Sequence, residues 1–365
     1  MLTSLQMHFS EVLKLILSKN TYSGPEAWYG SDMKNQQSSW LYELTAIEIE
    51  EIKQAVLLSK KTQPDIVKVT QQDFPLPTLE KNILAIHEQV LRGCGFTVIR
   101  NFPIESFNKE DAIRASWGLG CHLGDAVSQN ALGHMIGHVK AIGNEIKTTQ
   151  TRTYRTNDLQ PFHTDSCDMV ALFCLRPAPT GGLSSIVSAV TIHNEMMKIR
   201  QDLVEVLYQP FNIGRKGEIP EGKEKTYQMA IFHDYKGYLS IMHDRNFIDN
   251  ALSFDDVPRL TPLQEEALDM LDSLAADENL RLDFKLEIGD IQLAHNHSIL
   301  HARTKYQDHK DPTLKRHMLR LWLSQPDGRP LPPVFAERYS NIELGSKRGG
   351  IVVPGMTEKI PMEPE

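Results

Sequence analysis

The pattern of hydrophobic and polar positions divides the chain into a helical first part and a strand-rich second part. In the first part, apolar residues recur at helical spacing in three segments, 3–18, 43–60 and 79–91. The run from Gly95 to Phe102 is almost continuously apolar and predicts a buried strand. From Lys109 to Trp117 we expect a short helix, which Gly118 and Gly120 end.

Short apolar or alternating segments predict strands through most of the remaining chain. These segments are 137–142, 160–165, 169–175, 185–190, 226–232, 238–242, 281–286, 291–295 and 316–324. One strong helix interrupts them from Thr261 to Ala276, with Thr261 as N-cap and Pro262 in the first turn. Many short strands with one inserted helix indicate a mainly β fold with peripheral helices around a double-stranded β-helix, or jelly-roll, core.

The same pattern suggests three parts along the chain. Residues 1–75 form a helical N-terminal extension, and residues 76–330 form the strand-rich domain. A proline-rich break at 326–333 ends this domain, so we expect residues 331–365 to be a loosely ordered tail that wraps around it.

Composition narrows the classes of partner. The net charge is -8, and no run of five or more Lys and Arg occurs, which argues against nucleic acid. No stretch of eighteen apolar residues occurs, and the first residues lack a basic leader, so neither a membrane span nor a signal peptide is expected. The four cysteines form no CxxC pair, which favours reduced thiols and a cytoplasmic location. A homo-oligomer stays possible.

His163 and Asp165 are the first candidate metal ligands. They lie two residues apart, and on a strand that spacing sends both side chains to one face. Two imidazoles and one carboxylate form the facial triad of iron(II) oxygenases. The pair alone is weak evidence: with 14 histidines, about one His-x-Asp match arises by chance. A hydrogen-bonded pair at the end of a strand is the alternative.

A histidine-rich segment far along the chain offers the third ligand. Of its three histidines, only His301 is followed by an arginine two residues on, whereas His295 and His297 fit a core or supporting pair better. A second His-x-Asp pair, His309 and Asp311, lies in a polar stretch with a proline and is interpreted as a solvated loop.

The last predicted strand carries Arg316 and Arg320 on the same face as Trp322. Two interpretations stay open. In one, the leucine face packs in the core and both arginines are solvated. In the other, the arginines line a barrel interior, where a buried guanidinium needs an anionic partner such as the distal carboxylate of 2-oxoglutarate.

Taken together, these motifs resemble the taurine dioxygenase (TauD/TfdA-like) family of Fe(II)/2-oxoglutarate-dependent oxygenases over roughly residues 95 to 325. The resemblance rests on four motifs in the family's order. They are FHTD at 162–165, PTGGLSS at 179–185, NHSILHAR at 296–303 and RHMLR at 316–320. Ordered co-occurrence is far more specific than any one of these motifs.

The resemblance implies a role for each matched residue. His163, Asp165 and His301 would bind Fe(II), and Arg316 would anchor 2-oxoglutarate. Ser184 stands where the family has a threonine and would bring a hydroxyl to the co-substrate, and Arg320 would lie near co-substrate or substrate. The enzyme would use O2 to oxidise a small-molecule substrate by hydroxylation, desaturation or cyclisation, with release of succinate and CO2. Because Asp165 is present, halogenation is disfavoured.

Two other functions remain as alternatives. The first is a cupin-like metalloenzyme that does not use 2-oxoglutarate, with His295, His297 and His301 as ligands, although the expected glutamate is missing. The second is a non-catalytic β-barrel binding protein whose histidines are structural. The charged segment 216–225 is interpreted as a solvated loop, with a loop at the site entrance as the alternative.

Overall fold

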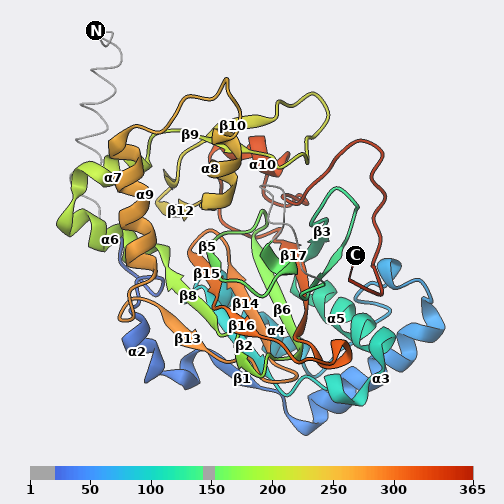
Figure 1. Cartoon of the computed structure of the whole chain (residues 1–365). Helices are drawn as coiled ribbons and strands as arrows, with labels where there is room; N and C mark the ends of the chain where they lie inside the picture. Colours follow the sequence, from blue (N-terminus) through green and yellow to red (C-terminus); the bar gives the residue numbers. More distant parts are fainter. Residues whose placement is uncertain (1–20, 143–152, 365) are drawn as a thin grey trace.

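Two β-sheets pack against each other at the centre of the protein (Figure 1). The computed structural model describes residues 21–142 and 153–364, so the helix expected at 3–18 lies outside the described residues. The larger sheet is antiparallel except for its first, parallel pair. Its strands, in order, are β1 (Leu41–Glu43), β2 (Phe96–Arg100), β14 (Ile291–His295), β6 (Met169–Arg176), β17 (His317–Ser324) and β3 (Asp125–Val127), with β4 (Ile136–Val139) also on β17.

The smaller sheet has four strands and carries most of the predicted site motifs. In order they are β13 (Leu282–Phe284), β8 (Ser184–Ser188), β15 (Ile299–Arg303) and β5 (Gln160–His163). Apolar side chains of both sheets fill the space between them, among them Phe96 and Trp322 from the larger sheet and Ile186 and Ile299 from the smaller. Because successive side chains of a strand point to opposite faces of the sheet, one face of each sheet contributes its side chains to a shared core.

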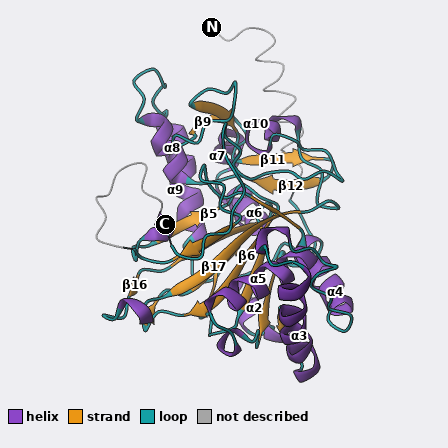
Figure 2. Cartoon of the chain, turned by 90° about the vertical axis from the view of Figure 1, so that its right-hand side faces the viewer, coloured by secondary structure: helices purple, strands orange, loops and turns teal. Residues whose placement is uncertain are grey.

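Helices cover the outer faces of both sheets (Figure 2). Against the larger sheet pack α3 (Ala46–Thr62), α4 (Glu80–Leu91) and α5 (Lys109–Leu123), and against the smaller sheet pack α6 (Ala189–Ile199), α7 (Gln201–Leu207) and α9 (Pro262–Ala275). Among the described helices, none has the length and apolar content that a bilayer crossing needs.

Smaller elements complete the chain. They are α2 (Gly30–Lys34), α8 (Arg245–Leu252), α10 (Ala336–Tyr339), the pairs β9 (Phe211–Gly214) with β10 (Thr226–Met229) and β11 (Phe232–Tyr235) with β12 (Tyr238–Ile241), and β7 (Thr180–Gly181) paired with β16 (Tyr306–Gln307). In the described part of the chain, helices hold more residues than strands. The fold is thus mixed α and β, and the expectation of a mainly β chain overstated the strands.

The helix expected at 109–117 continues through both glycines to Leu123. Gly118 and Gly120 do not end it because they serve close packing: a Cβ on Gly118 would lie 2.3 Å from the Phe74 ring, and one on Gly120 would lie 2.5 Å from Leu321 Cδ2. The helix ends at Gly124, whose φ of 152° few other residues adopt.

Two predicted strands also differ from the structure. The strand expected at 185–190 ends at Ser188, because the Ser188 hydroxyl accepts from the backbone N–H of Thr191 and caps α6. The segment 226–232 divides between β10 and β11. Buried helices α6 and α7 were not predicted.

Several residues of the tail after residue 330 are anchored in the core, which a loosely ordered tail would not show. Arg348 is fully buried, and its Nε lies 2.8 Å from Oδ2 of Asp168, the residue directly before β6. The Tyr339 hydroxyl donates to the carbonyl of Cys167 over 3.1 Å. The tail thus holds the segment that follows the predicted ligand pair, and the domain boundaries at residues 75 and 330 remain a prediction.

Candidate metal centre and its two cavities

Two histidines meet across neighbouring strands of the smaller sheet. His163 ends β5 and is the register partner of His301 on β15, so the antiparallel pairing places the two side chains side by side. Their ring centroids lie 4.3 Å apart. Strand pairing therefore joins two candidates that are more than a hundred residues apart in sequence.

Asp165 completes the cluster from just beyond the strand. The expectation that His163 and Asp165 share one strand was wrong, because β5 ends at His163. Instead, the backbone N–H of Asp165 donates to Asn296 Oδ1 over 3.0 Å, which fixes the turn. The Asp165 carboxylate lies 4.0 Å from His163 Nε2 and 3.6 Å from His301 Nε2. One ligand atom from each of the three residues lies within 4.8 Å of the others.

The protonation states suit metal binding. His163 Nδ1 lies 2.8 Å from the carbonyl of Pro161, so this nitrogen carries the proton and Nε2 presents its lone pair to the cluster. Burial, together with His301, lowers the pKa of His163 to about 4, which keeps the ring neutral. Burial opposes ionisation of Asp165, but Arg320 and the histidines outweigh it and lower the pKa of that carboxyl.

A first cavity beside the cluster contains Arg316 and is here called the Arg316 cavity. Its lining residues are Val139, Tyr154, Gln160, His163, Leu172, Ser184, Leu286, His301, Ala302, Arg303, Arg316 and Arg320. Arg316 is 4% exposed, and its Nε and Nη1 have no hydrogen-bond partner among the residues that the structure describes. Burial lowers the pKa of Arg316. An unpaired buried guanidinium is costly, so the cavity fits an anionic ligand.

The neighbours of Arg316 strengthen that fit. Arg303 shares the cavity, and burial with the charge of Arg316 lowers its pKa to about 10. Gly182 has a φ of 68°, and a Cβ there would lie 3.4 Å from Arg316 Nε, so the glycine turn leaves room for the guanidinium. The Ser184 hydroxyl also lines the cavity, and it donates to Gln292 Oε1.

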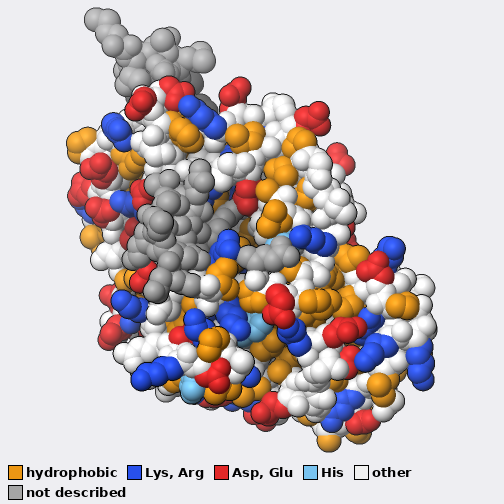
Figure 3. Space-filling model, turned by 45° about the vertical axis from the view of Figure 1, so that its right-hand side comes forward, with side chains coloured by type: hydrophobic (Ala, Val, Ile, Leu, Met, Phe, Trp, Pro, Cys, Tyr) orange, Lys and Arg blue, Asp and Glu red, His pale blue; other side chains and the backbone are white. Residues whose placement is uncertain are grey.

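A second cavity shares Tyr154, Gln160, His163 and Arg320 with the first and is here called the Arg338 cavity. Its lining residues are Thr153, Tyr154, Gln160, His163, Thr164, Asp165, Ser166, Lys216, Asp244, Asn246, Phe247, Arg320, Trp322 and Arg338. On the face of the molecule in Figure 3, several Lys and Arg side chains flank a histidine. Lys216, the first residue of the segment 216–225, lines this cavity, which favours the alternative of a loop at the site entrance for this residue.

Arg320 links the two cavities. Its Nε donates to Gln129 Oε1 over 2.8 Å, and its Nη1 lies 3.4 Å from Asp165. The guanidinium stacks between the rings of Tyr154 and Trp322, each centroid 5.0 Å away. Arg316 and Arg320 are both buried. The interpretation that both arginines face the interior is therefore confirmed, and the interpretation that both are solvated was wrong.

The other candidates lie outside the cluster. His295 and His297 are buried in the core, and His297 Nε2 lies 2.7 Å from Asp168 Oδ1. That placement confirms them as core residues. His309 and Asp311 are exposed, and Asp311 caps a single helical turn, as expected for a solvated loop.

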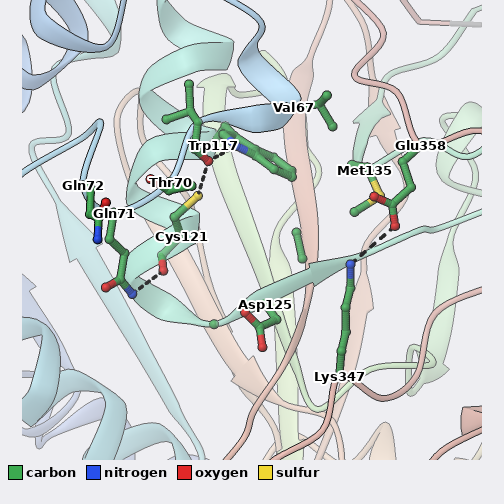
Figure 4. Close-up of a pocket in the computed structure, with 13 residues that line it drawn as sticks. Val67, Thr70, Gln71, Gln72, Trp117, Cys121, Asp125, Met135, Lys347 and Glu358 are labelled. Carbon is green, nitrogen blue, oxygen red and sulfur yellow. Dashed lines mark hydrogen bonds and ion pairs between the residues drawn. The ribbon is translucent and has the colours of Figure 1, made fainter. Parts of the chain in front are cut away.

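A larger groove lies away from the cluster (Figure 4). There the Cys121 thiol donates to the carbonyl of Val69 over 3.3 Å, and Lys347 Nζ lies 3.4 Å from Glu358 Oε1. None of its lining residues belongs to the cluster or to the two cavities.

Several site residues were not recognised as participants in the sequence analysis, among them Asn296, Lys216, Phe247 and Arg338. Asn296 opens the NHSILHAR motif, so its position in that motif is a signal that was available. Lys216, Phe247 and Arg338 come from a loop, a short helix and the tail, and nothing in the sequence spacing joins them.

The comparison with protein families decides the relationship. A family model described as taurine catabolism dioxygenase TauD, TfdA family matches residues 59–322, which is most of the chain. The chain belongs to the TauD/TfdA family. It is therefore a 2-oxoglutarate-dependent non-haem iron oxygenase, with Fe(II), 2-oxoglutarate and O2 as the reactants that accompany its substrate.

Individual relatives agree with this family. FR-33289 synthase of Streptomyces rubellomurinus is 30% identical over 336 residues, which are 90% of this chain and 98% of that protein. A taurine hydroxylase-like protein of Stachybotrys chartarum is 26% identical over 306 residues, which cover 81% of this chain and 77% of that protein.

Solved structures of other oxygenases share the fold. Asparagine oxygenase, solved with Fe(II), 3-hydroxyasparagine and succinate, aligns with a TM-score of 0.61 at 16% identity over 78% of this chain and 93% of that one. The non-heme iron oxygenase OrfP, solved with Fe and alpha-ketoglutaric acid, aligns with a TM-score of 0.57 at 16% identity over 78% and 94%. At such low identity, the alignments show the fold alone.

Proposed function

We propose that His163, Asp165 and His301 hold the iron and that Arg316 binds the distal carboxylate of 2-oxoglutarate. The observation that carries this proposal is the combination of a two-histidine, one-carboxylate cluster with the buried Arg316 guanidinium in the adjoining cavity, two of whose nitrogens lack a hydrogen-bond partner among the described residues. The two facing sheets, with the cluster at the edge of the smaller one, also support a jelly-roll core.

The donor set fits iron(II). Two neutral imidazoles and a carboxylate on one side of the ion leave positions for a chelating co-substrate and for dioxygen. A cupin-like centre would instead need His295 and His297, but their rings belong to the core behind the cluster. The cluster therefore favours the 2-oxoglutarate-dependent alternative.

The protein's own contribution is to bind the co-substrate and the substrate, to orient them and to enclose them. Bound iron and 2-oxoglutarate supply the oxidising power, and substrate oxidation accompanies release of succinate and CO2. Arg316 would orient the co-substrate through two parallel hydrogen bonds. The Arg338 cavity is the place for a small-molecule substrate, because it reaches the cluster from another side.

A matched pair of variants tests the ligand assignment. Asp165→Ala removes the carboxylate of the cluster, whereas Asp311→Ala removes that of the exposed His309 pair. We expect Asp165→Ala to lose iron binding and iron-dependent succinate formation, and Asp311→Ala to keep both. Equal losses in the two variants would contradict the proposed ligand set.

A further inference from the structure

Gln160 is a half-buried glutamine that reaches both cavities beside the cluster. It begins β5, the strand that ends at His163, and its side chain lines the Arg316 cavity and the Arg338 cavity alike. Its Oε1 is buried and has no hydrogen-bond partner among the described residues. A primary amide offers two N–H donors and an acceptor oxygen, so the described residues use little of the hydrogen-bonding capacity of Gln160.

The nitrogen end of this amide contacts the nitrogen atom that we assign to iron. Gln160 Nε2 lies 3.4 Å from His163 Nε2. Because His163 Nδ1 donates to the carbonyl of Pro161, Nε2 carries the lone pair and accepts from the Gln160 amide. The reverse amide orientation would place the Gln160 oxygen against that lone pair, which is repulsive. The iron-free protein therefore uses the metal-binding lone pair of His163 for a hydrogen bond from Gln160.

Iron and the Gln160 amide compete for this lone pair. A metal bound at His163 Nε2 takes the lone pair and frees the amide N–H groups, at little cost because the hydrogen bond is long. Among the described residues, no other hydrogen-bond partner then holds the amide, since Oε1 has none. The freed N–H groups lie next to the metal-binding atom of His163. A ligand oxygen on the metal is therefore the acceptor nearest to them.

Two other buried glutamines near the cluster are held differently. Gln129 exchanges two hydrogen bonds with Arg320, one through Oε1 and one through Nε2. Gln292 has an unpartnered Nε2, but its Oε1 accepts from the Ser184 hydroxyl and the residue lines neither cavity. Of these three glutamines, only Gln160 combines an amide that metal binding releases with contact to the cluster.

We propose that Gln160 is a further co-substrate-binding residue: in the iron-loaded protein, its amide N–H donates to an oxygen atom by which 2-oxoglutarate chelates the metal. This inference rests on the proposed function, because it takes His163 as an iron ligand and the Arg316 cavity as the co-substrate site. Arg316 binds the distal end of 2-oxoglutarate and Gln160 the end at the metal. The two residues together fix the orientation of the co-substrate.

Anaerobic titrations of the full-length protein test the inference, first with iron(II) and then with 2-oxoglutarate. Gln160→Met keeps the length of the side chain and removes both polar ends. We expect its affinity for iron(II) to be unchanged or higher, since the competing hydrogen bond is gone, and its affinity for 2-oxoglutarate to fall about tenfold. The visible charge-transfer band of the chelate should also shift, because a chelating oxygen has lost a hydrogen bond.

Two further variants make the comparison sharper. Gln160→Glu keeps the shape of the side chain but replaces the donor with a carboxylate, so it should weaken 2-oxoglutarate binding at least as much as Gln160→Met. Its similar size and polarity keep the test valid if Gln160→Met folds poorly. Gln228→Met removes an exposed glutamine on β10, and it should match the native protein in both titrations.

A purely structural role for Gln160 would give the opposite pattern. If Gln160 only oriented His163, Gln160→Met would lose affinity for iron(II) and, once loaded, would bind 2-oxoglutarate as the native protein does. That result would overturn the inference, and so would native affinities with an unshifted band. The absence of a band in the iron-loaded native protein would instead overturn the proposed function, and the inference with it.

Discussion

Arg320 Nη1 lies 3.4 Å from both carboxylate oxygens of Asp165, and the two side chains are only 10% and 7% exposed. In the iron-free protein, this contact is the main compensation for the carboxylate, whereas bound iron would share that task. We therefore expect Arg320→Gln to destabilise the iron-free protein by about 3 kcal/mol and the iron-loaded protein by less. Denaturant unfolding of both forms measures the difference, and equal losses would contradict it.

Arg316 should govern affinity for the co-substrate. Replacing it with Gln removes the charge that the buried carboxylate needs, so the KM for 2-oxoglutarate should rise by about a hundredfold, the equivalent of about 3 kcal/mol. Arg176→Gln is the matched control, because Arg176 lies on the neighbouring strand but does not line the cavity. Steady-state kinetics measures the KM for 2-oxoglutarate of both variants. An unchanged KM in Arg316→Gln would contradict the assignment of Arg316 to the co-substrate.

Gly182 should matter for the co-substrate beyond its backbone conformation. Gly182→Ala introduces strain at a φ of 68° and brings a methyl group against Arg316, whereas Gly237→Ala introduces similar strain at 84° with no atom within 4 Å. Both variants should lose about 1 kcal/mol of stability. Only Gly182→Ala should also raise the KM for 2-oxoglutarate, so the same kinetic change in both variants would argue against this contact.

His193 should contribute to the pH dependence of stability. Burial lowers its pKa from 6.5 to about 4, so the folded protein keeps it neutral while the unfolded chain binds a proton below pH 6.5. Its stabilising contribution is complete above pH 6.5 and is lost as the pH falls toward 4, by up to about 1.4 kcal/mol per pH unit. His193→Phe should flatten the slope of unfolding free energy over that range. His309→Gln, at an exposed position, should leave it unchanged.

Local signals explain the elements that were predicted well. Thr261 and Gln264 form the capping box that begins α9, and both partners are adjacent in sequence. The histidines of the cluster were predicted because the four sequence motifs of this chain stand in the same order as in the family. By contrast, α5 runs through Gly118 because Phe74, far away in sequence, packs on it. Spacing cannot reveal such a partner.

The substrate side of the site was the least predictable part. Arg338 lies in a tail that composition describes as irregular, and its burial depends on contacts with Ser166 and Phe247. Sequence motifs report residues that share one strand or turn. The Arg338 cavity instead depends on how separate segments pack together.

Anaerobic titration of the iron-free protein with iron(II) and then 2-oxoglutarate tests the metal centre most directly. We predict a weak visible charge-transfer band from the chelate, saturating at one iron per chain, present in the native protein and in Asp311→Ala and absent in Asp165→Ala. Folded, iron-loaded native protein that shows no such band with 2-oxoglutarate would contradict the assignment of the cluster and the Arg316 cavity.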